Sequence, residues 1–163
     1  MTEHVGSQEV QVVIFSLGGE EYCVDISCVR EIIRMVEITR IPKLPDFVEG
    51  VINLRGQITT VIDMRKRFEM EPLENDANRI IIIDLQGEPF GAVVDSVYEV
   101  KTISLDMIVS VPSIKHAQTQ EYLKGICKID DRILILLDFE KILSDLELAQ
   151  TIKIKEEMET VNT

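Results

Sequence analysis

Gly19-Glu20-Glu21-Tyr22 recurs 68 residues later as Gly87-Glu88-Pro89-Phe90. The match continues at the same offset, because Val29-x-Glu31-Ile32 is followed by Val97-x-Glu99-Val100. Each four-residue stretch is a turn signal set between runs of β-branched and aromatic residues, which is typical of a hairpin. The sequence therefore contains one β-rich unit twice.

A second block of the repeat runs from Gly50 to Asp63 and returns, 75 residues later, from Gly125 to Asp138. The polar connector Ser110–Gln120 accounts for the larger offset. The chain of 163 residues therefore holds two small units. A unit of roughly 60–70 residues buries only about 60% of its unfolded surface. We expect the two units to share an interface.

Each copy offers about five short strands, of which Val10–Leu17 is the first. Small units of hairpins close into barrels, and closure removes exposed sheet edges. The predicted fold is mainly β: two SH3-like five-stranded β-barrels packed side by side, over residues 10–75 and 76–140. Exchange of terminal strands is compatible with the sequence, which leaves open which barrel the first strand completes.

The spacing of the apolar residues changes near the end of the sequence, from the pattern of strands to that of a helix. Five apolar residues then fall at helical spacing on one face: Phe139, Ile142, Leu143, Leu146 and Ala149. This predicts a C-terminal amphipathic helix from Phe139 to about Ile152. Residues 141–163 are assigned to this helix and a polar tail.

The net charge of −12 opposes a phosphate backbone and an anionic membrane surface, so nucleic acid and direct membrane insertion are not expected as partners. Apolar runs such as Ile80–Ile83 are far shorter than the roughly 20 residues of a membrane span. No signal peptide is visible. Cys23, Cys28 and Cys127 each lie among apolar residues and are interpreted as buried thiols in a reducing cytoplasm.

The sequence offers no constellation for catalysis. His4 and His116 stand alone in polar segments, and no phosphate loop or nucleophile motif is present. Asp63 and Asp138 occupy equivalent places in the two copies, which favours a structural role as acceptors of backbone N–H groups where a strand ends. We expect no enzyme, no cofactor and no metal.

The two copies differ most at one turn, where Asn53–Gln57 corresponds to Lys128–Arg132. The first copy places Arg55 beside Gly56, and Gly56 permits a positive φ. Arginine is enriched at the energetic centres of protein interfaces. Arg55 is therefore a candidate binding residue, and the alternative is a surface turn residue with a local salt bridge.

The run Val48–Gly56, continuing through Val61–Arg65, resembles the signature of the CheW family of chemotaxis coupling proteins. Further similarity lies at Gly19–Tyr22, Arg40–Pro42, Gly91–Val97 and Leu134–Asp138, so that it covers about residues 10–150. The resemblance implies a non-catalytic adaptor that couples the cytoplasmic tips of chemoreceptors to the regulatory domain of the histidine kinase CheA. Its expected location is the cytoplasm, at membrane receptor arrays.

Carried over position by position, the resemblance implies two sets of binding residues. The receptor-binding residues would be Arg55, Glu31, Ile80, Ile81 and Val97. The kinase-binding residues would be Val29 and Ile58. The residues themselves leave a second interpretation open for Ile80, Ile81 and Val97, which is a place in the core.

Two positions depart from the family pattern: Thr60 stands where proline is usual, and Glu49 stands where some members carry a basic residue. An alternative function is a double-barrel interaction module of another two-component or motility pathway. A small hydrolase or metal-binding protein is the third hypothesis, and the missing constellation of His, Cys and carboxylate argues against it.

Overall fold

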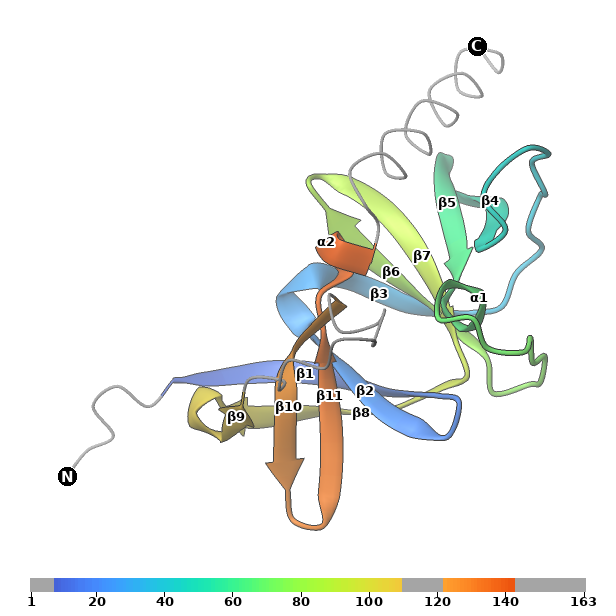
Figure 1. The fold of residues 1–163 in the computed structure, drawn as a ribbon. Coiled ribbons are helices and arrows are strands. Elements are labelled where there is room, and N and C mark those ends of the chain that lie inside the picture. The colour runs from blue at the N-terminus through green and yellow to red at the C-terminus, as the bar shows by residue number, and fades with distance from the viewer. Residues whose placement is uncertain (1–7, 110–121, 143–163) are drawn as a thin grey trace.

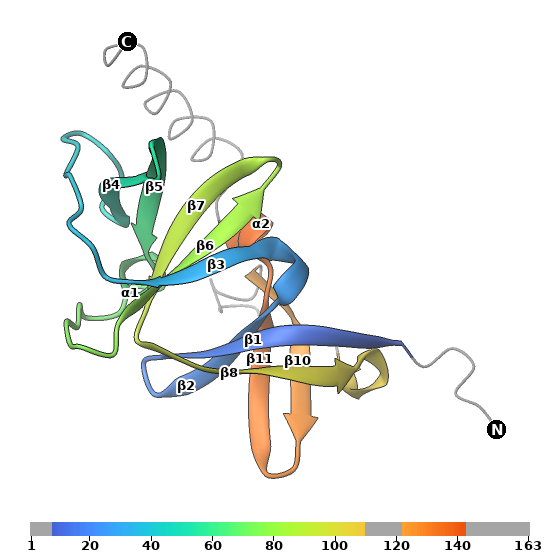
Figure 2. The same ribbon diagram turned by 180° about the vertical axis from the view of Figure 1, so that it is seen from behind.

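The computed structural model describes residues 8–109 and 122–142. It confirms a mainly β fold, built from two sheets packed against each other (Figures 1 and 2). The five-stranded sheet has the order β3 (Val29–Arg34), β6 (Arg79–Leu85), β7 (Glu88–Val94), β5 (Gln57–Asp63), β4 (Val48–Leu54). The six-stranded sheet has the order β8 (Ser96–Ser104), β1 (Glu9–Leu17), β2 (Glu20–Asp25), β11 (Arg132–Leu137), β10 (Leu123–Ile129), β9 (Ile108–Val109).

The two copies exchange their first hairpins. The hairpin of β1 and β2 belongs to the first copy, yet β2 runs parallel to β11, with Tyr22 opposite Ile135. The equivalent hairpin of β6 and β7 belongs to the second copy, yet β7 runs parallel to β5, with Phe90 opposite Thr60. The first strand therefore completes the sheet of the second copy. The two sheets do not coincide with the predicted ranges 10–75 and 76–140.

In each sheet, the chain that leaves one edge strand continues to the opposite side of the same sheet and forms backbone pairs there. After β3, Thr39 forms one bridge with Val51 of β4, through backbone bonds of 2.8 and 2.9 Å. After β8, a 3-10 turn, η2 (Leu105–Met107), leads into β9, which pairs with β10. The predicted number of five strands per unit is corrected here, because the short β9 adds a sixth strand to one sheet.

The apolar side chains form three buried clusters. The largest lies between the sheets and draws on both, with Phe15 and Tyr22 from one and Ile81 and Phe90 from the other. A smaller cluster lies inside each sheet, around Ile80 in the five-stranded one and around Leu134 in the six-stranded one. The shared central cluster confirms the expected interface between the units.

Two short helices begin where β5 and β11 end, α1 (Met64–Arg67) and α2 (Phe139–Ile142). Asp63 Oδ1 accepts hydrogen bonds from the amides of Arg65 and Lys66, at 2.8 and 3.4 Å. Asp138 Oδ1 accepts one from the amide of Glu140 at 3.0 Å. The predicted structural role of the two aspartates is confirmed.

The helix predicted from Phe139 to about Ile152 lies only in part within the described residues, which hold its first turn as α2. His4, His116 and the connector Ser110–Gln120 lie outside the described residues. A 3-10 turn, η1 (Ile26–Cys28), joins β2 to β3.

Candidate interaction surface

The turn between β4 and β5 has the geometry of a tight hairpin. Arg55 has a φ of 51° and Gly56 a φ of 86°, so two successive residues occupy the left-handed region, as a type I′ turn requires. The Asn53 side chain accepts a hydrogen bond of 2.7 Å from the Gly56 amide. The turn thus holds a non-glycine residue in a conformation for which glycine, asparagine or aspartate is preferred.

The Arg55 guanidinium pairs with the Glu31 carboxylate of β3. Nη1 donates to Oε1 at 3.0 Å and Nη2 donates to Oε2, so the contact is bidentate. The side chain of Arg55 is 72% exposed and that of Glu31 is 27% exposed. The hydrogen bond from Arg55 lowers the pKa of Glu31 below its ordinary value. The structure therefore brings together the two charged residues to which the family resemblance gives a role in receptor binding.

The equivalent turn of the second copy carries its cation elsewhere. Asp130 stands at the place of Arg55, and the cation is Arg132, at the far end of the turn. Arg132 donates two hydrogen bonds of 3.0 Å to Glu21 and lies 3.5 Å from Glu99, the counterpart of Glu31. In both copies an arginine of the turn forms an ion pair with the same glutamate of the repeat, Glu31 in the first copy and Glu99 in the second. Only the first copy presents it from the tip of the hairpin.

Two of the predicted receptor contacts are in the core instead. Ile80 and Ile81 are fully buried. Ile80 points into the cluster inside the five-stranded sheet, and Ile81 into the cluster between the sheets. A partner cannot touch either side chain in this conformation, so their assignment to the binding surface is not retained.

Val29 and Val97 occupy equivalent, half-buried positions that pack against the central cluster. Near them on the same strands are Ile32 and Val100, which are exposed and also equivalent. Ile32 pairs with Ile81, and Val100 with Val13, and both partners belong to the central cluster. Paired residues share a face, so apolar positions on β3 and β8 border the central core. Sequence reasoning missed Ile32 and Val100, although both lie in the repeat.

Ile58 lies on β5 three residues after Arg55 and is half-buried. Its counterpart in the second copy, Ile133, is exposed. Ile58 therefore adjoins the Arg55 turn and can contribute only part of its side chain to a contact.

No helix in the described part of the chain has the length and apolar character that a membrane crossing demands. Within residues 8–109 and 122–142, no group of three or more His, Cys, Asp and Glu side chains is arranged to hold a metal ion.

Comparison with known proteins gives concordant matches. The family described as the CheW-like domain matches residues 11–147. The chemotaxis protein CheW of Klebsiella aerogenes is 40% identical over 140 residues, which are 85% of this chain and 84% of that protein. The chemotaxis protein CheW of Bacillus subtilis is 34% identical over 152 residues, 93% of this chain and 96% of that protein.

A solved structure is also similar. The crystal structure of the scaffolding protein TtCheW from Thermoanaerobacter tengcongensis matches with a TM-score of 0.79 and 38% identity, over 84% of this chain and 94% of that chain.

Proposed function

This chain belongs to the CheW family, and from that premise we propose that it joins the cytoplasmic tips of chemoreceptors to the regulatory domain of the histidine kinase CheA. It is a non-catalytic chemotaxis adaptor, and its proposed location is the cytoplasm, at receptor arrays. Through it the state of the receptor would control the activity of the kinase. Such an adaptor needs two surfaces that can be occupied together.

The observation that carries the proposal is the exposed pair of Arg55 and Glu31. The left-handed φ of Arg55 strains the backbone, and an exposed ion pair contributes little to stability. Stability alone therefore gives no reason for an arginine at this position. Its guanidinium is held in one orientation by Glu31 and has further N–H donors available for a partner. Those donors suit carboxylates and carbonyl oxygens on a receptor helix.

The proposed receptor surface comprises Arg55, Glu31 and the apolar positions that border the central core. Val97 and Val100 lie on β8, and Ile32 lies on β3. An amphipathic helix binds by laying apolar side chains on such positions while a charged group fixes its register. The proposed kinase contacts are Val29 and Ile58, each through the exposed part of its side chain.

The test is a pair of titrations with the full chain, one against a receptor-tip fragment and one against the CheA regulatory domain. Arg55→Ala should weaken receptor binding by at least about tenfold, the loss expected for a residue at an interface centre. Binding of the kinase domain should stay within about twofold of the wild type. Glu31→Gln should give a smaller loss in the receptor titration, because Arg55 keeps its charge but loses its orientation.

Arg132→Ala is the matched control, because it removes the equivalent cation from the second copy. It should leave receptor binding unchanged. Equal losses for Arg55→Ala and Arg132→Ala would contradict the assignment of the site. A wild type that binds neither partner would contradict the function itself.

A further inference from the structure

The Arg55 turn is supported from both edges of the five-stranded sheet. Glu31 lies on β3 and Asn53 on β4, and these two strands are the opposite edges of that sheet. Glu31 accepts hydrogen bonds from the guanidinium of Arg55, while Asn53 contacts the backbone of the turn. The ion pair therefore joins one edge of the sheet to a hairpin at the other edge, and it depends on the direction in which the hairpin presents Arg55.

Asn53 has a defined contact within the turn. Its Oδ1 accepts a hydrogen bond of 2.7 Å from the amide of Gly56, the second left-handed residue. That bond determines how the side-chain amide is turned, because only the oxygen can accept from an N–H group. Asn53 is exposed, so water can replace the bond, and its removal should change the free energy of unfolding little. Its effect is expected on the conformation of the turn and not on the core.

The hairpin of β6 and β7 has the same arrangement. Gln86 and Gly87 are its two left-handed residues, with φ values of 53° and 86°. Asp84, two residues before Gln86, accepts a hydrogen bond of 3.0 Å from the amide of Gly87. Asn53 and Asp84 therefore occupy the same place in their hairpins and form the same bond.

The hairpin of β1 and β2 differs at this place. Both of its left-handed residues are glycines, Gly18 and Gly19, with φ values of 63° and 85°. Ser16 stands where Asn53 stands in the Arg55 hairpin, and its hydroxyl oxygen lies 2.7 Å from that of Ser96 on β8. Glycine adopts a left-handed φ without strain, whereas a residue with a side chain does not. The bond to the turn amide thus accompanies a first left-handed residue that carries a side chain.

The second copy forms a different turn at the position equivalent to the Arg55 turn. Lys128 stands in place of Asn53, and an ammonium group offers no acceptor to an amide. Asp131 stands in place of Gly56, and within this turn, which the structure describes in full, only Asp130 has a positive φ. The acceptor and the glycine are therefore both replaced in the copy that does not present an arginine from the tip of the hairpin.

The direction of the Arg55 side chain depends on the conformation of the turn. The backbone angles of a residue set the direction in which its side chain leaves the chain. An extended or right-handed Arg55 would direct its guanidinium elsewhere, and the bidentate contact with Glu31 would be lost. A bidentate contact requires both the distance and the plane of the two groups to match, so it is sensitive to a small rotation.

We propose that Asn53 is a positioning residue for receptor binding: its side chain holds Arg55 in the left-handed conformation that directs the guanidinium to Glu31 and presents it to a receptor helix. Asn53 acts through Arg55 and does not itself contact the partner. The receptor part of this inference rests on the proposed function, and the part that concerns Arg55 and Glu31 does not.

The first experiment is NMR on the full chain labelled with ¹⁵N and ¹³C. The ¹H–¹⁵N NOE of the Arg55 Nε–H group reports how firmly the guanidinium is held. The side-chain carboxyl carbon of Glu31, followed as the pH is changed, gives the pKa of that carboxyl. In the wild type this pKa should lie below its ordinary value, because of the hydrogen bond from Arg55. Asn53→Ala should bring the Glu31 pKa back towards the ordinary value and reduce the NOE of Arg55.

Asp84→Ala is the matched control, because it removes the same bond from the other hairpin. It also removes the ion-pair partner of Arg30, at 3.1 Å, so it should cost at least as much stability as Asn53→Ala. The signals of Arg55 and Glu31 should nevertheless stay as in the wild type. Asn53→Asp keeps the acceptor and should restore the NOE of Arg55. A loss of stability alone would move neither signal in the folded protein, so these readouts separate positioning from a structural role.

The second experiment is a titration with a receptor-tip fragment. Asn53→Ala should weaken binding by about two- to fivefold, because the competent orientation of Arg55 would be populated only about 20–50% of the time. This loss should be smaller than that of Arg55→Ala, which removes the guanidinium itself. Asn53→Asp should recover most of the affinity, and Asp84→Ala should leave it unchanged.

The outcomes separate this inference from the proposed function. If Asn53→Ala leaves the signals of Arg55 and Glu31 as in the wild type, the inference is overturned, whatever the titration shows. An equal loss of affinity in Asp84→Ala and Asn53→Ala would also overturn it. If Arg55→Ala binds the receptor fragment as the wild type does, the proposed function fails, and the NMR signals still decide whether Asn53 positions Arg55.

Discussion

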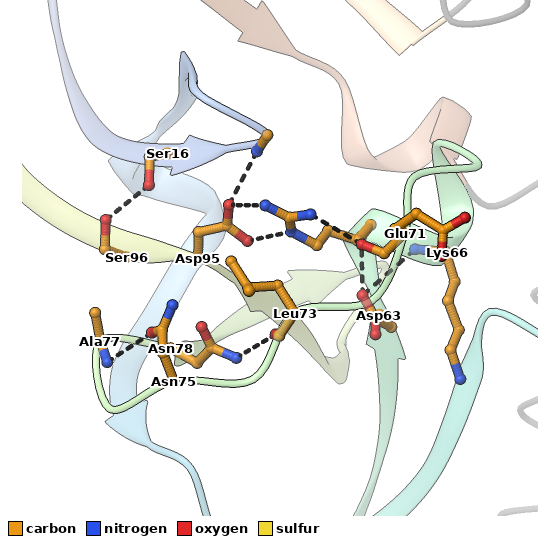
Figure 3. Close-up of polar contacts among 12 residues, drawn as sticks. Ser16, Asp63, Lys66, Glu71, Leu73, Asn75, Ala77, Asn78, Asp95 and Ser96 are labelled. Carbon is orange, nitrogen blue, oxygen red and sulfur yellow. Dashed lines mark hydrogen bonds and ion pairs between the residues drawn. The ribbon is translucent and has the colours of Figure 1, made fainter.

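Arg65 of α1 donates two hydrogen bonds of 2.7 Å to the carboxylate of Asp95, from Nε to Oδ1 and from Nη2 to Oδ2. The amide of Gly18 donates to the same carboxylate at 2.9 Å. Asp95 is the one residue between β7 and β8, and those strands belong to different sheets. Asp95 thus connects three parts of the fold: the β1–β2 turn, the helix α1 and the point where the chain crosses from one sheet to the other (Figure 3).

Removing either partner of this pair should destabilise the fold. The side chains of Arg65 and Asp95 are 17% and 13% exposed, so each would leave a largely buried charge behind. We expect Arg65→Ala and Asp95→Asn each to lower the free energy of unfolding by about 1.5–3 kcal/mol, measured by urea denaturation. The double variant should cost less than the sum of the two, since both remove one interaction. Additive losses would contradict a direct coupling.

The same pair predicts a dependence on pH. Burial alone would raise the pKa of Asp95, but the hydrogen bonds from Arg65 and Gly18 outweigh it and hold the pKa below its ordinary value. A carboxyl whose pKa is lowered by folding stabilises the protein above its unfolded pKa of about 4. That contribution disappears as the pH falls through the folded-state pKa. Urea unfolding between pH 3 and 7 should show the gap between wild type and Asp95→Asn closing at low pH. If the difference in unfolding free energy between the two proteins stays constant over this pH range, the ionised Asp95 carboxylate is not its source.

Arg55→Asn should make the protein more stable while weakening its function. Asparagine is preferred at the first position of a type I′ turn, so relief of the left-handed φ should add up to about 1 kcal/mol to the free energy of unfolding. The receptor titration should lose affinity. Gln86→Asn is the control, because Gln86 and Gly87 form the same kind of turn, with φ values of 53° and 86°. It should bring the same gain in urea denaturation with receptor binding intact.

Gly50 should tolerate no side chain. Its φ is 147°, and a Cβ atom there would lie 2.0 Å from the carbonyl oxygen of Thr39, in the bridge that links β3 to β4. Gly50→Ala should cost more than about 3 kcal/mol. Gly56→Ala meets no atom within 4 Å and should cost only the strain of its φ, about 1–2 kcal/mol. Thermal unfolding of the two variants compares them directly, and a larger loss at Gly56 would contradict the contact at Thr39.

The three thiols should differ in reactivity. Burial raises the pKa of Cys23 to about 12, and the nearby Cys127, itself buried, adds to the rise. The thiolate is the reactive form. In the folded protein at pH 8, an alkylating reagent followed by mass spectrometry should therefore modify the half-buried Cys28 first. Cys23 and Cys127 should react at the rate of unfolding. Rapid labelling of all three would show that the buried cluster inside the six-stranded sheet, to which both belong, is open.

Much of the fold could be predicted from the repeat itself. Equivalent residues such as Tyr22 and Phe90 do occupy equivalent strands, and Asp63 and Asp138 do begin equivalent helices. The exchange of hairpins was beyond sequence reasoning for a physical reason. Tyr22 lies opposite Ile135, and Phe90 opposite Thr60, but Ile135 and Thr60 are themselves equivalent. A local pattern that is the same in both copies cannot say which copy a hairpin joins.

The candidate site was only partly predictable. The difference between the two turns led to Arg55, whose ion pair with Glu31 the structure contains. Ile80 and Ile81 lie on a strand that has core on both faces, and a continuous apolar run of this kind is typical of burial, which was the second interpretation left open for them. The buried Oδ1 of Asn78, which accepts no hydrogen bond from the described residues, could not be found in advance, since only the folded chain determines which polar atoms are left without a donor.

The exchanged hairpin has a consequence for synthesis on the ribosome. β1 and β2 emerge first, but β11, the neighbour of β2, is among the last strands made. About 100 residues separate them, which at roughly 5–20 residues per second is about 5–20 s of translation. The five-stranded sheet can form as soon as β7 ends at Val94, while the edge of β2 still exposes N–H and C=O groups. Until β11 has been made, the edge of β2 that it will cover has no strand to pair with, and this is the edge of the nascent chain most open to pairing with another chain.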